Sequence, residues 1–238
     1  MTAKLGPLFS LFIFLLIPAA TSKADKGDVF NVNPHARFYA EAVPYLNQGT
    51  KLWNDGDLKG AKQCFDSAIR IDRNIWPAYI DRAQILAKAG QLDLALQDCN
   101  TASRLRPDFY RTFIVRAEIY RRLGRCREAL ADLDRIISFR GNPETEALAL
   151  SRRAVLRATC KDSAVLDPRQ ALADAEQACR MNPKAVYKLD LAIAYAANGD
   201  LANAITYDEM AIKTGRLSDD ELREAKDQLS RYQRREHP

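Results

Sequence analysis

Residues 83–102, AQILAKAGQLDLALQDCNTA, and residues 117–136, AEIYRRLGRCREALADLDRI, carry one pattern, and the offset between the two copies is 117 − 83 = 34. Each stretch begins with a small residue, has a glycine seven places on, and has an alanine five places after the glycine. The same three places occur once more upstream at the same offset, at Gly49, Gly56 and Ala61. A fixed period of this length is typical of proteins built from helical repeats.

Within one period the apolar residues predict two antiparallel helices. They recur at intervals of three and four residues, which places them on one face of a helix. Small residues let the two helices approach closely, because a bulky side chain would push them apart. The glycine ends the first helix, since the position past a helix C-terminus often needs a positive φ. Pro107 and Pro183 end second helices because proline removes a hydrogen-bond donor.

The later repeats keep the pattern but contain insertions. The interval from Ala117 to Ala154 is longer than the regular period, and about three residues are added around GNPETEA. The interval from Ala154 to Ala171 is also longer than the matching interval from Ala83 to Ala95, so the segment CKDSAVLDP, residues 160–168, carries a five-residue insertion. A fifth repeat with normal internal spacing follows, with its columns at Ala192, Gly199, Ala204 and Ala211.

This pattern resembles the tetratricopeptide repeat, a helix-turn-helix unit of about 34 residues. The matching positions of the first three units are Tyr45, Gly49, Leu52, Gly56, Ala61, Phe65 and Ala68, then Tyr79, Ala83, Leu86, Gly90, Ala95, Ala102 and Pro107, then Phe113, Ala117, Tyr120, Gly124, Ala129 and Leu133. The sequence departs from the family at Arg73, Gly141 and Arg216, where a proline is usual. The resemblance implies an all-α fold, a right-handed α-solenoid of about five repeats over residues 42–217, which acts as a protein-binding scaffold.

Residues 1–24 differ in character from the repeats. Lys4 precedes the uncharged run LFSLFIFLLI, which Pro18 closes, and small residues follow up to Ala24. These features predict a signal peptide over residues 1–24 and export to the periplasm or the extracellular space. The apolar run is shorter than the roughly 20 residues that a membrane-spanning helix needs. An uncleaved N-terminal anchor is the alternative.

Two further segments flank the repeats. Residues 25–41 show no period and are expected to form an extended N-terminal arm. Residues 218–238 are expected to form a capping helix and tail, because Ser218 and Glu221 make a capping-box pattern. An open stack of repeats needs such a polar-faced helix to shield its last layer.

No motif for catalysis or cofactor binding is present in the sequence. The phosphate-binding G-x-x-x-x-G-K-[ST], the nucleophile pattern G-x-S-x-G and the zinc pattern H-E-x-x-H are all missing. The two histidines, His35 and His237, stand outside the repeats, and the cysteines form no Cys-x-x-Cys pair. We therefore expect no enzyme, no cofactor and no metal site. An enzyme remains the less favoured alternative.

Positive charge concentrates in the third repeat. The chain has a net charge of +5, and removal of residues 1–24 with their two lysines leaves +5 − 2 = +3. Between Arg104 and Arg140 there are ten Arg against five acidic residues. In the family the first helix of each pair lines the concave groove, which implies that this repeat presents a partner-binding set there. That set is Arg111, Glu118, Arg121 and Arg122.

Two interpretations of that set stay open. The arginines could hold an acidic peptide or chain end, because guanidinium groups bind carboxylates bidentately. Alternatively, Glu118 pairs with Arg122 at a spacing of four residues and the other arginines are solvated. Nucleic acid is not expected as a partner, since one short basic patch on a nearly neutral chain is too little.

Other first-helix positions give further indications about binding. Family members that hold a terminal carboxylate use a Lys and Asn pair, whereas the matching residues here are Leu46 and Thr50. In the last repeat the same face is apolar, with Val186, Leu189, Ile193 and Ala197. That face could take a partner segment or be covered by the C-terminal helix. Self-association as a structural or envelope component is the alternative function, and the oligomeric state is open.

The five cysteines admit one candidate disulfide. Cys126 begins the second helix of the third repeat, and Cys160 ends the first helix of the fourth. Both lie at the turn edge of neighbouring units, so a bridge between them is geometrically feasible. The alternative is that all five cysteines are buried apolar residues.

Overall fold

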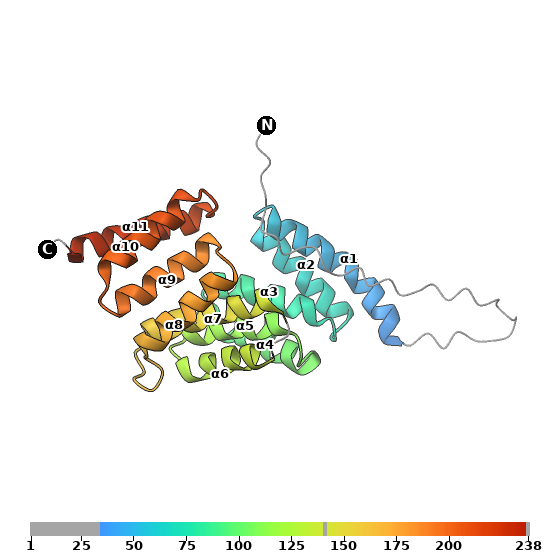
Figure 1. Cartoon of the computed structure of the whole chain (residues 1–238). Coiled ribbons are helices and arrows are strands. Elements are labelled where there is room, and N and C mark those ends of the chain that lie inside the picture. The colour runs from blue at the N-terminus through green and yellow to red at the C-terminus, as the bar shows by residue number, and fades with distance from the viewer. Residues whose placement is uncertain (1–33, 140–141, 237–238) are drawn as a thin grey trace, which may run out of the picture. The chain divides into compact units, whose positions relative to one another are not determined.

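The computed structural model describes residues 34–139 and 142–236, and within these ranges it contains eleven α-helices and no strand (Figure 1). The all-α class and the helical-repeat solenoid predicted from the sequence are confirmed. The chain divides into two compact units, Met1–Arg82 and Ala83–Pro238. None of the described helices is both long and apolar enough to cross a membrane. The proposed signal peptide lies outside the described residues.

The first unit contains α1 (Pro34–Asn54), α2 (Leu58–Ile71) and the beginning of α3 (Trp76–Lys88). A short turn joins α1 to α2, and the two helices pack against each other. The ring of Phe65 is fully buried and lies against the backbone of Gly49. A Cβ atom at position 49 would come within 2.6 Å of Phe65 Cε1. The small residue therefore allows the close approach that the repeat pattern predicted.

The N-terminal arm expected over residues 25–41 is wrong for its last part, because residues 34–41 are helical and belong to α1. Pro34 is the first residue of α1, a position where proline costs nothing because its missing N–H would have no partner within the helix. The side chain of Arg37 donates to that of Glu41 one turn later. Ala42 is fully buried, so packing adds to this local stabilisation. Residues 25–33 lie outside the described part of the chain.

The second unit holds the end of α3 and eight further helices. These are α4 (Leu92–Leu105), α5 (Tyr110–Arg122), α6 (Cys126–Ser138), α7 (Pro143–Thr159), α8 (Pro168–Met181), α9 (Ala185–Ala197), α10 (Leu201–Lys213) and α11 (Asp219–Glu236). The helices pack in the pairs α5–α6, α7–α8 and α9–α10, and α7 also contacts both α5 and α9. The first helices of three successive repeats therefore adjoin. We call their exposed and half-buried side chains the first-helix face.

The repeat columns have the roles that the sequence predicted for them. Ala154, Ala192, Ala129 and Ala204 are fully buried where the helices of a pair meet. Gly124 is the middle residue of the three-residue turn between α5 and α6 and has φ +73°, a conformation that residues other than glycine rarely adopt.

Both insertions lengthen specific elements of the fourth repeat. Helix α7 has 17 residues where α5 and α9 have 13, and the extra turn lies at its N-terminus. The side chain of Asn142 caps this turn by accepting from the Glu144 N–H. The second insertion makes residues 160–167 an eight-residue connection between α7 and α8. Val165 of this loop is buried in the core beside α5 and α6.

Helix α11 follows the last repeat and packs on α10 (Figure 1). Ser218 and Glu221 form the capping box: Glu221 N–H donates to Ser218 Oγ at 3.3 Å, and Ser218 N–H donates to Glu221 Oε2 at 2.8 Å. The apolar cluster at this helix contains Tyr232 with Ala192 and Ala204. The four apolar residues considered for cover by this helix are outside that cluster and remain half-buried: Val186, Leu189, Ile193 and Ala197.

Candidate partner-binding face

Arginines at the position just before the small residue hold neighbouring repeats together. Arg116 makes two parallel hydrogen bonds to Asp132 of its own repeat, at 2.8 and 2.7 Å, and a third to Asn100 Oδ1 of the preceding repeat at 2.9 Å. Its hydrogen bonds with Asp132 raise the pKa of Arg116 above its ordinary value. This arginine is therefore engaged in packing rather than available to a ligand.

Arg153 makes the same kind of contact one repeat later. It binds Asp174 of its own repeat at 2.8 and 2.7 Å, and Asp134 of the preceding repeat at 2.6 Å. Only 16% of its side-chain surface is exposed. Sequence reasoning did not identify this structural role, although Arg116 and Arg153 occupy the same repeat position.

The proposed partner-binding residues divide into different environments. Glu118 accepts two hydrogen bonds from Arg121, at 2.9 and 2.8 Å. Arg122 instead donates to the Ala87 carbonyl at 2.6 Å, which satisfies a carbonyl in the last turn of α3. The alternative that paired Glu118 with Arg122 is therefore wrong. Arg111 is half-buried in the first turn of α5.

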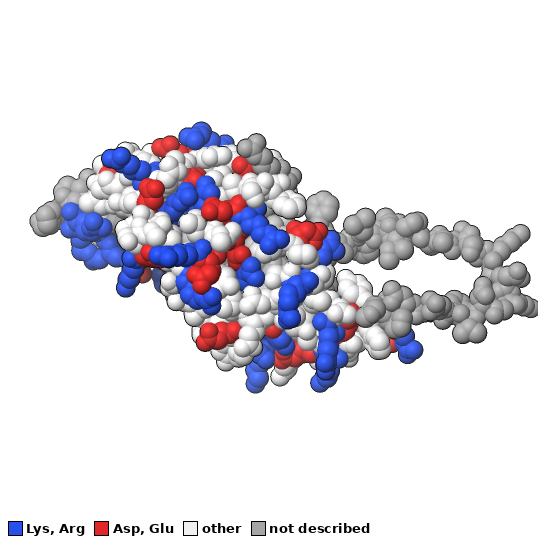
Figure 2. Space-filling model, turned by 90° about the horizontal axis from the view of Figure 1, so that it is seen from below, with Lys and Arg blue, Asp and Glu red and all other residues white. Residues whose placement is uncertain are grey.

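Most other arginines of the basic stretch also have partners. Arg106 pairs with Asp108, Arg125 with Glu128 and Arg127 with Asp162, while Arg135 donates to the Pro107 carbonyl. Figure 2 shows acidic and basic side chains interspersed over the face in view. The count of ten arginines therefore overstates the positive charge that is open to a ligand.

A polar cluster crosses the first-helix face and was missed from the sequence. Ser151 of α7 donates a hydrogen bond to the buried carboxylate of Asp190 on α9, and Arg152 Nη1 lies 3.9 Å from the same carboxylate. Burial raises the pKa of Asp190, while Arg152, the Ser151 hydrogen bond and Arg121 act in the opposite direction. Side chains of α5, α7 and α9 therefore interact electrostatically around the Asp190 carboxylate.

The repeat register contained a signal for this cluster. Arg152 and Asp190 each stand two residues before the small residue of their repeat, which is Ala154 or Ala192. An alignment of the repeats that allows for the three-residue insertion before Ala154 would have placed these residues at the same repeat position.

The face is mixed rather than uniformly basic. Val155, Leu189 and Ile193 are half-buried on the same helices as the polar cluster. The first unit offers no similar polar set at the compared positions, because Leu46 is buried and the Thr50 hydroxyl donates to the Leu46 carbonyl at 3.0 Å. The face of the second unit therefore combines hydrogen-bond donors with apolar surface.

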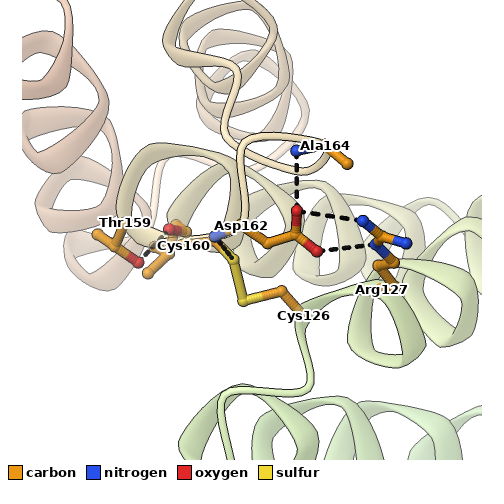
Figure 3. The surroundings of a disulfide bond; sticks show 7 residues. Cys126, Arg127, Thr159, Cys160, Asp162 and Ala164 are labelled. Atoms are coloured by element: carbon orange, nitrogen blue, oxygen red, sulfur yellow. Dashed lines mark hydrogen bonds and ion pairs between the residues drawn. A yellow bond between two sulfur atoms is a disulfide. The ribbon is translucent and has the colours of Figure 1, made fainter.

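The structure brings the two candidate cysteines together as a disulfide (Figure 3). The Sγ atoms of Cys126 and Cys160 are 2.08 Å apart, so the start of α6 is linked to the root of the inserted loop. Asp162 adds a second attachment, because its carboxylate accepts from Arg127 Nε at 2.7 Å and from the Ala164 N–H at 2.9 Å.

Three cysteines of the described residues are free thiols: Cys64, Cys99 and Cys179. Burial raises the pKa of Cys99 to about 12 and that of Cys179 to about 11. Both are therefore neutral thiols at neutral pH and poor nucleophiles. Residues 34–139 and 142–236 contain no group of three or more side chains placed to bind a metal ion.

Comparison with known proteins agrees with this architecture. The family model of the tetratricopeptide repeat matches residues 37–108 and 164–220, which is more than half of the chain. No match was found among curated proteins.

Among solved structures, a thermophilic tetratricopeptide-repeat protein of Thermus thermophilus is similar with a TM-score of 0.66 and 21% identity, over 79% of this chain and 98% of that one. The pilF protein of Pseudomonas aeruginosa gives a TM-score of 0.63 at 17% identity, over 83% of this chain and 90% of its own. YrrB, described as a tetratricopeptide-repeat protein with an unusual peptide-binding site, gives 0.52 at 18% identity, over 81% of this chain and 97% of its own. At these identities the likeness concerns the fold. Repeat columns, helix pairing and the family match together show that the chain belongs to the tetratricopeptide-repeat family.

Proposed function

We propose that this protein is an exported scaffold that holds an extended segment of a partner protein on its first-helix face. The fold supports a protein–protein interaction scaffold, because stacked helical repeats present a long continuous surface. A similar structure, YrrB, is described as having a peptide-binding site. Binding without catalysis and without a cofactor is what we expect.

The observation that carries the proposal is the state of Arg152. Its side chain is 41% exposed, and its contact with Asp190 is long at 3.9 Å. The guanidinium therefore keeps donors for a ligand while it stays positioned beside an anchored carboxylate. Arg121 lies in the same electrostatic environment, and Val155 and Ile193 supply adjacent apolar surface.

The partner chemistry follows from these neighbours. A segment with acidic side chains separated by apolar ones would pair its carboxylates with Arg152, Arg121 and Arg111 and bury its apolar side chains between them. An acid that binds Arg121 must compete with Glu118, which selects for a well-placed carboxylate over diffuse negative charge. Nucleic acid is not part of the proposal.

Capture of partners by cross-linking in the native compartment tests this function. The variants Arg152→Glu and Arg121→Glu should each reduce the recovered partner at least tenfold, because they put a repulsive charge on the face. The control is Arg104→Glu, an exposed arginine of α4 whose side chain contacts Thr101. Equal recovery with all three variants would remove the first-helix face from the proposal.

Export is supported by residues 1–24 and suits a protein with a disulfide, since disulfides persist in oxidising compartments. Mass analysis of the protein recovered from outside the cytoplasm should give a chain that begins at Asp25 or a few residues earlier. A chain that retains Met1 would favour the anchor instead.

Self-association is the second candidate function, favoured by exposed aromatic side chains on α1. Phe38, Tyr39 and Tyr45 are 46%, 40% and 42% exposed. Sedimentation at increasing concentration should reveal larger species if α1 is a contact, and Phe38→Ser with Tyr45→Ser should abolish them. A monomer at all concentrations would exclude this function.

A further inference from the structure

Helix α11 packs on the last repeat with few fully buried side chains. Among the side chains of residues 219–235 that the structure describes in this helix, only Ala225 and Tyr232 are buried, and most of the others are charged or polar. The buried residues of the apolar cluster that it closes are Tyr232, Ala192 and Ala204, and half-buried side chains such as Tyr195 and Ile205 pack against them. Elements with so little buried apolar surface open locally at low free energy. A single additional interaction can therefore decide whether α11 is docked.

Asp208 lies in that contact and is an unusual residue for its position. It stands four residues after the second-helix alanine, where the earlier repeats have Phe65, Cys99, Leu133 and Ala175. The last repeat thus places a carboxyl group in a core position. Asp208 is completely buried. An ionised carboxylate in such a place costs far more free energy than a neutral carboxyl group.

The hydrogen bonding of Asp208 leaves it half satisfied. Gln228 Nε2 of α11 donates to Asp208 Oδ1 at 3.0 Å. Asp208 Oδ2 has no hydrogen-bond partner among the residues that the structure describes. A neutral carboxyl group with its proton on Oδ2 suits this arrangement better than a carboxylate, which would need donors for both oxygens.

The groups around Asp208 do not offset a negative charge. From α11 the titratable neighbour is Tyr232, and burial raises the pKa of Tyr232 to about 12, so the phenol stays neutral. Arg231 and Arg235 influence Tyr232 from the same helix, but neither forms an ion pair with Asp208 in the described structure. Helix α9, also packed on α10, contributes Ala192 and Tyr195 to the adjoining cluster. Burial raises the pKa of Asp208 to about 7 against the opposing hydrogen bond from Gln228.

We propose that Asp208 makes the cap formed by α11 sensitive to pH. With a neutral carboxyl group at Asp208, α11 stays docked on α10 and covers the end of the repeat stack. When Asp208 ionises, the charge is solvated only if α11 moves away, so the docked form loses population. Release uncovers the apolar surface around Ala204 and Ala192. The end of the scaffold is therefore closed in acidic surroundings and open in alkaline ones.

Amide hydrogen exchange of the purified chain, corrected for intrinsic exchange rates, tests this proposal. Protection of the α11 amides should fall by up to tenfold for each pH unit between about pH 5 and pH 7, because opening is linked to loss of one proton, and it should level off above that range. Asp208→Asn keeps the shape and removes the titration, so its protection should not depend on pH. Glu209→Gln, which alters an exposed neighbour on α10, should behave as the wild type.

Gln228→Leu provides a second test, which remains informative even if Asp208→Asn does not fold normally. It removes the donor that favours the ionised form, which raises the pKa of Asp208 in the docked form, so the fall in protection should continue to higher pH before it levels off. A wild-type profile in both Asp208→Asn and Gln228→Leu would overturn the proposal. So would equal pH dependence of amides in α11 and α5, since that would be opening of the whole unit.

Discussion

Arg153 and Asp174 are joined by two parallel hydrogen bonds of 2.8 and 2.7 Å, and the same arginine reaches Asp134 of the preceding repeat. Arg116 and Asp132 make the equivalent pair one repeat earlier. Each guanidinium thus connects its own repeat with the one before. The consequence is that part of the basic character of this region belongs to the cohesion of the stack.

Removing Arg116 should destabilise the protein more than removing Arg153. Arg116→Ala leaves the carboxylate of Asp132, 9% exposed, without its bidentate partner, which we expect to cost about 3 kcal/mol. After Arg153→Ala, the carboxylate of Asp174 still has Arg157 at 2.7 Å, so the expected loss is about 1–2 kcal/mol. Urea unfolding followed by circular dichroism measures both, with Arg104→Ala as a control within about 0.5 kcal/mol. A loss for Arg153→Ala as large as for Arg116→Ala would contradict this order.

The fold could be predicted because the small-residue columns have a steric cause that acts locally. Wherever Ala or Gly stands at the crossing of two helices, the helices can approach, and the spacing of those residues then sets the repeat boundaries. Both insertions, before α7 and between α7 and α8, could be located for the same reason. The helical residues 34–41 were missed because this stretch has no apolar period of its own.

The candidate site was less predictable because ion pairing depends on how repeats stack. Sequence spacing alone suggested Glu118 with Arg122, yet the partner is Arg121, and Arg122 instead reaches a carbonyl of the preceding repeat. Contacts such as Arg153 with Asp134 cross from one repeat to another. Charge counting treats all arginines alike, whereas the repeat position separates those that bind within the stack from Arg152 on the first-helix face.

The pairing of Gly49 with Phe65 predicts a steric effect confined to the first repeat. Gly49→Ala should destabilise by about 1–3 kcal/mol despite the better helix propensity of alanine, because its Cβ would overlap the buried ring. Later repeats combine alanine at this position with smaller partners such as Cys99 or Leu133. The double variant Gly49→Ala with Phe65→Leu should therefore regain much of the stability that Gly49→Ala loses. Thermal unfolding measures this difference. No recovery would mean that the clash with Phe65 is not the cause.

The disulfide between Cys126 and Cys160 predicts a specific thiol count. Alkylation of the denatured protein without reductant should modify three cysteines, and all five after reduction. Closing the loop between these two cysteines should stabilise the folded chain by roughly 2–4 kcal/mol relative to Cys126→Ser with Cys160→Ser. The same double variant should increase proteolysis in residues 160–167, because the loop loses its covalent attachment and keeps only non-covalent ones such as those of Asp162 and Val165. Five reactive thiols in the unreduced sample would exclude the bridge.

Asp66, which is half-buried, and Asp208, which is buried, should affect the pH dependence of the free energy of unfolding in opposite directions. Burial raises the pKa of Asp66, but hydrogen bonds from Lys62 and Arg82 outweigh it and leave the pKa below the ordinary 3.8. A carboxyl group whose pKa is lower in the folded than in the unfolded protein stabilises the folded protein at pH values above the unfolded pKa. This contribution is lost as the pH falls through the pKa of the folded protein. Asp66→Asn should therefore be less stable than the wild type at pH 7, with a difference that shrinks towards pH 3.

Asp208 has a folded pKa of about 7, well above the value of 3.8 for an unperturbed aspartate. The contribution of Asp208 to the stability of the folded protein is therefore fully present below about pH 4 and is lost as the pH rises towards 7. Relative to the wild type, Asp208→Asn should gain stability over this range, which is the reverse of Asp66→Asn. Urea unfolding of both variants at pH 3, 4, 5.5 and 7 measures the two slopes, with the Asp66→Asn change expected between pH 3 and 4 and the Asp208→Asn change between pH 4 and 7. Glu209→Gln is the matched control for a substitution on the exposed surface of α10. Slopes of the same sign for Asp66→Asn and Asp208→Asn would show that overall charge, rather than the local surroundings of each carboxyl group, governs the response.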